Sequence, residues 1–208
     1  KYVCDTGRRT IMVFDSADRY VGEIGDPKTC VPLDVAIHGN ELYVVDVTGG
    51  EIEVWSTDGE LIRMISSKGE APDQLMTPTN IAIAENYLFV TDMLHQAVKV
   101  FTLDGTFQNL IGGGGANWGK FARPKGIAVD DQMNIYVADA QFDSVQVFQP
   151  NGAFLVAFGK PGELPHSTGM PAGLFIDRSS IPLFQSYLDP NFKAEYLLFI
   201  VNQFGLNK

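Results

Sequence analysis

The chain has 208 residues, of which 45% are apolar and 11% aromatic, so it can bury a sizeable core. Its net charge is −10, and this sign opposes binding driven by nucleic-acid phosphates. No apolar run reaches the roughly 18 residues needed to cross a bilayer. We therefore expect no nucleic-acid partner and no membrane span.

Along the chain, pairs of short apolar strands recur with turns between them. Copies occupy residues 2–19, 41–59, 87–105 and 134–152. One Asp ends the first strand of every pair, at Asp5, Asp46, Asp92 and Asp139. These aspartates are 41, 46 and 47 residues apart. A period of roughly 40–50 residues with several short strands is typical of a β-propeller blade.

The most regular copy predicts a blade of four antiparallel strands. We expect these strands at 126–130, 134–139, 144–149 and 153–159. A proline precedes the innermost strand, where its missing N–H costs no ladder bond. It occurs as Pro32, Pro78, Pro124 and Pro171. The predicted fold class is therefore an all-β propeller, here of about four to five blades.

The stretch Pro124–Asp139, followed by Val145–Phe148, resembles the NHL repeat. The resemblance covers nearly the whole chain and implies a propeller that is six-bladed when complete, or ~270 residues at ~45 per blade. We expect residues 1–208 to form one domain that is incomplete at both ends. Either a longer polypeptide or another chain would complete the ring.

The three histidines are candidate metal ligands, because some propeller lyases bind zinc on the central axis. His38 is expected in a turn on the bottom face, whereas His95 and His166 are expected in loops on the top face. Histidines on different faces do not converge on one metal ion. We therefore interpret them as surface residues.

Two repeated positions could hold a cation in the channel. The serial aspartates each end a strand, where a carboxylate accepts backbone N–H bonds, so we interpret them as structural. Two residues after the leading proline, the chain has Asp34, Asn80, Gly126 and Gly173. This position resembles a metal site of gluconolactonase-like propellers, but first indicates a turn into the strand.

Cofactor motifs are few. Cys4 and Cys30 could pair only if the fold brings them close together, and no haem-attachment or zinc-binding C-x-x-C pattern occurs. The glycine run 112–115 lacks the G-K-[ST] of a phosphate loop, and we expect a flexible connection there. The following Trp118 and Phe121 either pack between blades or form an exposed aromatic contact. No cofactor is expected in this segment, although a channel metal is possible.

The last unit departs from the repeat by an insertion at 178–193. Its second strand ends at Asn202, 63 residues after Asp139. The insertion is apolar, and helical spacing predicts one or two helical turns before Pro190. Its candidate partner-binding residues are Leu183, Phe184, Tyr187, Leu188 and Phe192. They either pack against the bottom face or bind another protein.

These features favour a non-catalytic interaction or scaffold propeller, and catalysis has no carrier that we can name. The NHL resemblance, closest to bacterial extracytoplasmic proteins, implies a periplasmic, outer-surface or secreted location. It also implies a protein partner, such as a redox protein alongside multihaem cytochromes or a chain that completes the ring. The alternative is a metal-dependent lyase or lactonase-type hydrolase with its site in the central channel.

Overall fold

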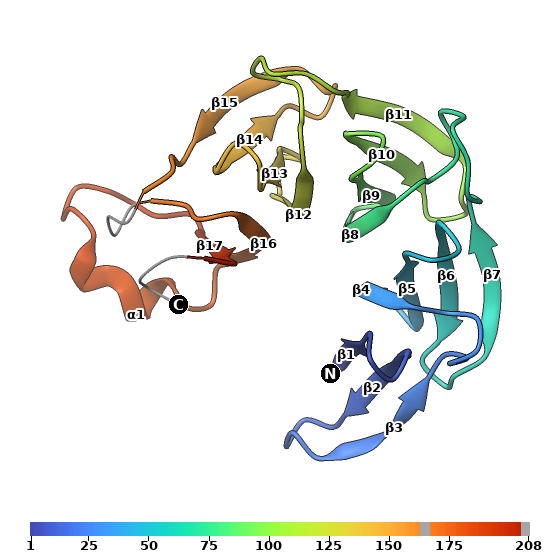
Figure 1. Cartoon of the computed structure of the whole chain (residues 1–208). Coiled ribbons are helices and arrows are strands. Elements are labelled where there is room, and N and C mark those ends of the chain that lie inside the picture. The colour runs from blue at the N-terminus through green and yellow to red at the C-terminus, as the bar shows by residue number, and fades with distance from the viewer. Residues whose placement is uncertain (163–166, 205–208) are drawn as a thin grey trace.

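A computed structural model describes residues 1–162 and 167–204, which form five antiparallel sheets arranged as an open arc around a central axis (Figure 1). Each sheet is one blade. Blade 1 contains β1 (Tyr2–Asp5), β2 (Thr10–Phe14) and β3 (Tyr20–Ile24). Blade 5 contains β16 (Pro171–Asp177) and β17 (Leu197–Asn202), joined by α1 (Ile181–Phe184) and the 3-10 turn η1 (Gln185–Tyr187).

Blades 2, 3 and 4 each have four strands in meander order. Blade 2 contains β4 (Pro32–His38), β5 (Glu41–Asp46), β6 (Glu51–Ser56) and β7 (Leu61–Ile65). Blade 3 contains β8 (Pro78–Ala84), β9 (Tyr87–Asp92), β10 (Ala97–Thr102) and β11 (Phe107–Gly112). Blade 4 contains β12 (Pro124–Val129), β13 (Ile135–Asp139), β14 (Ser144–Phe148) and β15 (Phe154–Phe158). The predicted all-β fold class is confirmed as a partial β-propeller.

The core lies between neighbouring blades. One cluster joins blade 2 to blade 3 through side chains such as Tyr43, Val54 and Leu88. A second joins blade 3 to blade 4 through Phe89 and Val137. Because β-branched and aromatic residues fill both faces of the middle strands, each blade is stabilised by the next one along the arc.

The turn glycines have the backbone conformation that the sequence predicts. Gly59, Gly105 and Gly152 have φ of +92°, +98° and +84°. Their N–H groups close the turns onto Ser56, Thr102 and Gln149. Since L-residues rarely adopt this conformation, these positions fix the hairpins between the third and fourth strands.

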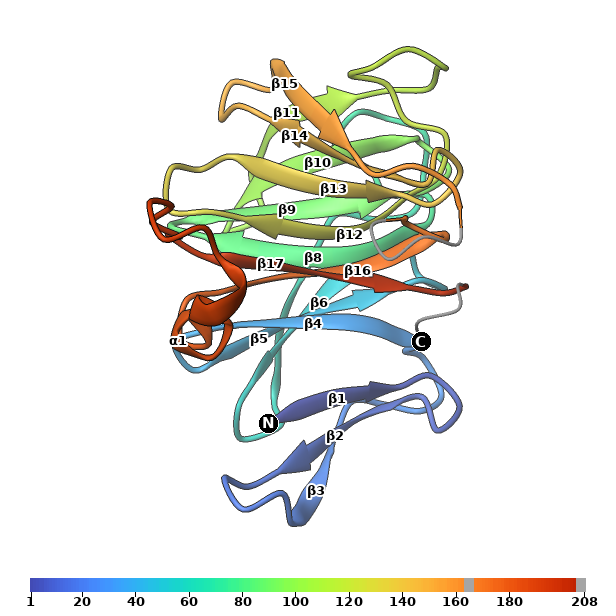
Figure 2. The ribbon, with the colours of Figure 1, turned by 90° about the vertical axis from the view of Figure 1, so that its left-hand side faces the viewer.

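The two faces of the arc differ in what they carry. Figure 2 shows the connection from β15 to β16 at one end of the strands and α1 at the other end. We call the face with the blade-to-blade connections the top and the face with α1 the bottom. None of the helices in the described part of the chain is long and apolar enough to span a membrane.

Candidate functional site

The insertion at 178–193 extends from the bottom end of β16. Asp177 starts it by accepting the backbone N–H groups of Ser179, at 2.8 Å, and Ser180, at 3.1 Å. Hydrogen bonds from Ser179 and Ser180 lower the pKa of Asp177 to about 2. Pro182 then lies in the first turn of α1, where a backbone N–H has no partner within the helix, so the missing N–H of proline costs nothing. The short helical turns predicted before Pro190 are confirmed.

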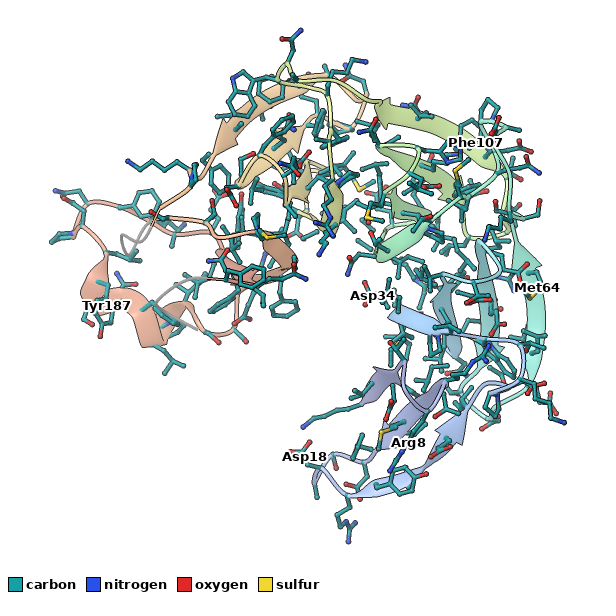
Figure 3. All side chains as sticks on the ribbon, viewed as in Figure 1. Arg8, Asp18, Asp34, Met64, Phe107 and Tyr187 are labelled. Carbon is teal, nitrogen blue, oxygen red and sulfur yellow. The ribbon has the colours of Figure 1, made fainter. Side chains whose placement is uncertain are left out.

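Most candidate partner-binding residues of the insertion face solvent. The exposed fraction is 76% for Leu183, 83% for Tyr187 and 59% for Phe192. Phe184 is exposed to 37%, and Leu188 is half-buried. The stripe therefore does not pack as a whole against the bottom face. Tyr187 stands at the outer edge of the molecule (Figure 3).

Aromatic contacts connect the insertion to blade 5. The ring of Phe184 lies 6.0 Å from that of Phe199 on β17 and 6.4 Å from that of Tyr187. Phe199 is paired directly with Phe175 on β16, and directly paired residues share one face of a sheet. We call Phe175, Phe199, Phe184 and Tyr187 the aromatic strip. An exposed run of this kind is typical of an interaction surface.

The base of the insertion is fixed to blade 4. The guanidinium of Arg178 forms a 2.7 Å ion pair with Asp131 and stacks over the ring of Tyr196. The hydroxyl of Tyr196 is hydrogen-bonded to that of Tyr136, whose pKa is raised chiefly by burial. A cavity of about 420 Å³ beside these residues is also lined by Lys193 and Glu195. These contacts hold the start and end of the insertion while its middle stays exposed.

The sequence does not identify the strand half of the aromatic strip. Phe175 is exposed to 63% and Phe199 to 38%, although both lie in continuous apolar runs. Such runs predict a strand buried on both faces. Their exposure depends on which strands lie beside blade 5, and the local sequence of β16 and β17 carries no signal for that.

The histidines do not form one site in the described part of the chain. His38 is exposed on the bottom end of β4, as predicted, and His166 falls outside the described residues. His95 differs from the prediction of a surface residue, because only 16% of its side chain is exposed and its Nδ1 lies 2.7 Å from Asp92. The hydrogen bond with Asp92 holds the imidazole of His95 against the loop and away from solvent.

The structural interpretation of the serial aspartates is confirmed. Asp139 accepts backbone N–H groups from Ala122 and Arg123 in the preceding connection, at 2.8 and 3.1 Å. It also accepts those of Gln141 and Phe142 in its own turn. Asp46 and Asp92 make the corresponding bonds in blades 2 and 3. The carboxylates of Asp46, Asp92 and Asp139 therefore each tie two top-face loops together. Among the described residues, Asp5 accepts a backbone N–H only from Arg8 in its own turn.

The channel position after the leading proline is a β-bulge rather than a turn. The register shifts there in all four inner strands, and none of its residues has a positive φ. Asp34 accepts the Asn80 amide at 3.1 Å and the Ile81 N–H at 3.0 Å. Burial raises the pKa of Asp34, although these hydrogen bonds act in the opposite direction. A Cβ on Gly126 would lie 2.8 Å from the backbone of Gly173, so close strand approach explains that glycine.

Most residues that line the central cavity have apolar side chains. It measures about 440 Å³, and Asp34 is the one ionisable side chain among its described lining residues. Asp34 points toward the axis from β4 (Figure 3). The channel metal therefore stays a prediction, with Asp34 and Asn80 as its nearest oxygen ligands.

The two cysteines and the two aromatics after the glycine run are also placed. Cys4 and Cys30 are free thiols packed in one cluster between blades 1 and 2. Phe121 is fully buried between blades 3 and 4, whereas Trp118 is 61% exposed and stacks on Phe154. The two alternatives for these aromatics are thus each correct for one residue.

Comparison with known proteins supports the fold. Residues 74–157 match a family described as 6-bladed beta-propeller. Protein brain tumor of Drosophila melanogaster is 30% identical over 87 residues, which is 42% of this chain and 8% of that protein. The chain therefore spans a small part of this relative.

Solved structures with similar backbones include two enzymes and a chain of a protein complex. An inactive virginiamycin B lyase from Staphylococcus aureus with quinupristin has a TM-score of 0.63 and 15% identity, covering 83% of this chain and 55% of that one. A chain of a nidogen/laminin complex has a TM-score of 0.65 and 19% identity, covering 83% and 64%. The Kuenenia stuttgartiensis hydrazine synthase has a TM-score of 0.60 and 13% identity, covering 84% and 48%. At these identities the likeness shows the propeller fold alone.

Proposed function

We propose that this chain is a non-catalytic, NHL-type interaction propeller whose partner protein binds the insertion at 178–193. The observation that carries the proposal is the exposure of Leu183, Tyr187 and Phe192 on a segment fixed at both of its ends. Exposed aromatic side chains on an anchored loop are common centres of binding energy at protein interfaces.

The partner surface that fits these residues is apolar. The insertion carries Arg178 and Lys193 against Asp189, so it lacks the strong negative charge of the whole chain. The rings of Phe184 and Tyr187 present a surface that a protein groove can cover, with Tyr187 offering a hydroxyl at its edge. The partner is therefore a folded protein with an apolar groove.

The experiment uses the full-length protein in its native host. We expect the double variant Leu183→Ser/Tyr187→Ser to recover at least about 30-fold less partner, since an interface anchor is worth roughly 2 kcal/mol or more. The matched control is Leu94→Ser, because Leu94 is 58% exposed in a loop on the opposite face. Recovery should be unchanged in this control.

Two results would contradict the proposal. The first is equal partner recovery by the double variant when circular dichroism shows that it is folded. The second is equal loss in the Leu94→Ser control, because binding would then not depend on the insertion.

The location is part of the same proposal. The NHL resemblance supports a periplasmic, outer-surface or secreted protein, with a redox protein as one class of partner. Fractionation of tagged full-length protein in its host tests this, and a purely cytoplasmic pool would overturn the location without affecting the docking experiment.

A further inference from the structure

Three repeated positions at the top of each regular blade lie next to one another and carry different chemistry in blade 2. They are the residue two before the leading proline, the Asp that ends the second strand, and the third residue of the third strand. In chain order they hold Cys30, Asp46 and Glu53 in blade 2, Met76, Asp92 and Lys99 in blade 3, and Ala122, Asp139 and Gln146 in blade 4.

In blades 3 and 4, the third-strand residue binds the connection that leads into its own blade. The ammonium of Lys99 donates to the carbonyls of Ala71, at 3.1 Å, and Gln74. The amide of Gln146 donates to the carbonyl of Lys120 and accepts the N–H of Gly119, both at 2.8 Å. These buried side chains thus fasten the connections directly.

Blade 2 lacks this direct fastening because a carboxylate cannot donate to carbonyls. Glu53 is 3% exposed, and its described hydrogen bond is from the indole N–H of Trp55, at 2.8 Å. Its carboxylate lies beside the thiol of Cys30 and the carboxylate of Asp46. One ligand atom from each of these three residues lies within 4.8 Å of the other two.

The backbone of Cys30 also departs from the repeat. In blades 3 and 4, the N–H groups of Met76 and Ala122 bind the second carboxylate oxygen of the aspartate. The N–H of Cys30 instead donates to the carbonyl of Asp26, at 3.0 Å. The second carboxylate oxygen of Asp46, Oδ2, therefore accepts no bond from Cys30. Among the described residues, its one hydrogen bond is from the Gly49 N–H.

In the described part of the chain, no cation lies beside the buried carboxylates of blade 2. Among the described residues, no Lys or Arg nitrogen lies within 4.0 Å of the Asp46 or Glu53 carboxylate. The nearby cations are used elsewhere, since Arg9 donates to the Cys30 carbonyl and Lys68 to the Thr48 carbonyl. Uncompensated buried charge is costly, so a proton or a metal ion is needed to offset part of the negative charge of this cluster.

A further carboxylate lies beside Asp46. A Cβ on Gly49 would meet one oxygen of Asp46 and one of Glu51, each at 2.6 Å, so both carboxylates flank this glycine. Glu51 thus offers a further carboxylate beside Asp46, at the edge of the group formed by Cys30, Asp46 and Glu53.

We propose that Cys30, Asp46 and Glu53 bind one Zn²⁺ ion, which fastens the connection between blades 1 and 2. A thiolate with carboxylates suits zinc, a borderline-soft ion that takes sulfur and oxygen ligands in tetrahedral sites. Glu51 or a water molecule would supply the fourth ligand. The Cys30 thiol gives up its proton when the sulfur–zinc bond forms, so binding releases a proton. The metal would do in blade 2 what Lys99 and Gln146 do in the next two blades.

The competing account is that Glu53 stays protonated and only hydrogen-bonds Cys30. Burial raises the pKa of Glu53 in spite of the bonds from Trp55 and Cys30, and burial also raises the pKa of Cys30. Both accounts leave Cys30, Asp46 and Glu53 with the same net charge of about −1, because Zn²⁺ offsets two of three negative charges and protonation of Glu53 with a neutral thiol leaves only Asp46 charged. They differ in whether a thiolate–metal bond exists, and spectroscopy can detect that bond.

The test is metal binding to the full chain after chelation under reducing conditions. Zn²⁺ is titrated by calorimetry, and Co²⁺ is added as a spectroscopic probe of sulfur ligation. We expect one ion per chain, a thiolate-to-cobalt absorption band, and a thermal midpoint that rises with free Zn²⁺. Cys30→Ser and Glu53→Gln should each weaken Zn²⁺ binding by about tenfold or more. Glu53→Gln places the residue of blade 4 in blade 2.

Two control variants separate this site from other donors. Cys4→Ala removes the other thiol, and Asp34→Asn removes the channel carboxylate; neither should change Zn²⁺ affinity or the cobalt band. The absence of a thiolate band in the wild-type protein would overturn the proposal, as would full binding by folded Glu53→Gln. Loss of binding in Asp34→Asn would move the metal to the channel and also overturn it. The cobalt spectrum of the wild-type protein shows whether a thiolate binds the metal, even if Cys30→Ser does not fold.

Discussion

Blades 2 to 4 and blade 5 are built from the same sequence unit, but its polar positions and turns do different things in them. In the regular blades, the repeated polar positions are buried and bonded, as the four N–H contacts of Asp139 illustrate. In the last blade, Asn202 takes the Asp position, and its Oδ1 has no hydrogen-bond partner among the described residues. The insertion there exposes its apolar side chains instead. Regular positions therefore build the arc, and the irregular turn is free to bind.

Among polar residues, the largest expected effect is at the serial aspartates. Asp139→Ala leaves four backbone N–H groups without their acceptor in a fully buried site. We expect the free energy of unfolding to fall by about 3 kcal/mol or more. Asn202→Ala, the same position in blade 5, should cost less than about 1 kcal/mol. Urea unfolding of both variants measures this, and equal losses would remove the contrast between the blades.

A smaller effect is expected at the paired glycines of the inner strands. In Gly126→Ala, the new methyl group would meet the backbone of Gly173 at 2.8 Å, which strands cannot relieve by a side-chain movement. We expect a loss of about 1–3 kcal/mol. Gly173→Ala is the matched control, because its methyl would meet Val201 at 3.4 Å. If both variants unfold at the same denaturant concentration, close approach does not explain Gly126.

An ion pair within blade 2 predicts an acid-dependent stability. Arg63 binds Glu41 through two 2.8 Å hydrogen bonds, and also the Leu103 carbonyl. The bonds from Arg63 are the main cause of a pKa of about 2 for Glu41. Because this pKa lies below the ordinary value of 4.5, the stabilisation is complete above pH 4.5 and is lost as the pH falls toward 2.

Arg63→Ala tests this pH dependence. About a third of each side chain is exposed, so solvent screening limits the contribution of Glu41 to about 1–2 kcal/mol. The difference in thermal midpoint between wild type and variant should be largest near pH 6 and shrink toward pH 2.5. A constant difference across this range would mean that Arg63 stabilises the blades through packing and the Leu103 carbonyl alone.

The smallest stability effect is expected in the insertion. Tyr187 is 83% exposed, so Tyr187→Ser should change the free energy of unfolding by less than about 0.5 kcal/mol. A buried aromatic of a regular blade gives the contrast, since Phe121→Ala should cost about 3–5 kcal/mol. Thermal unfolding of the two variants checks this. A large loss in Tyr187→Ser would show that the insertion stabilises the fold.

The sequence predicts the repeat well because its signals are local. Alternating apolar residues, the leading proline and turn glycines such as Gly59 act within a few residues, and the structure has strands and turns where these signals place them. The role of the serial aspartates is also predictable, since a carboxylate at a strand end has backbone N–H groups in reach. Thus the fold class and the blade boundaries can be derived from the sequence.

The rest depends on contacts between distant segments. The contact of Cys30 with Glu53 requires knowledge of which loop packs on which strand. The exposure of Phe175 is similar, because its apolar strand predicts burial that only a neighbouring strand can supply. Sequence patterns specify which residues share a face of a strand, but not what covers that face.

Site-specific photocrosslinking tests the central claim most directly. A photoreactive residue replaces Tyr187 in the full-length protein in its native host, and the control has the same residue at Leu94 on the opposite face. Our account predicts one discrete crosslinked protein from position 187 and none from position 94. A folded protein that gives no crosslink from position 187, or equal products from both positions, would contradict the assignment of the insertion as the docking surface.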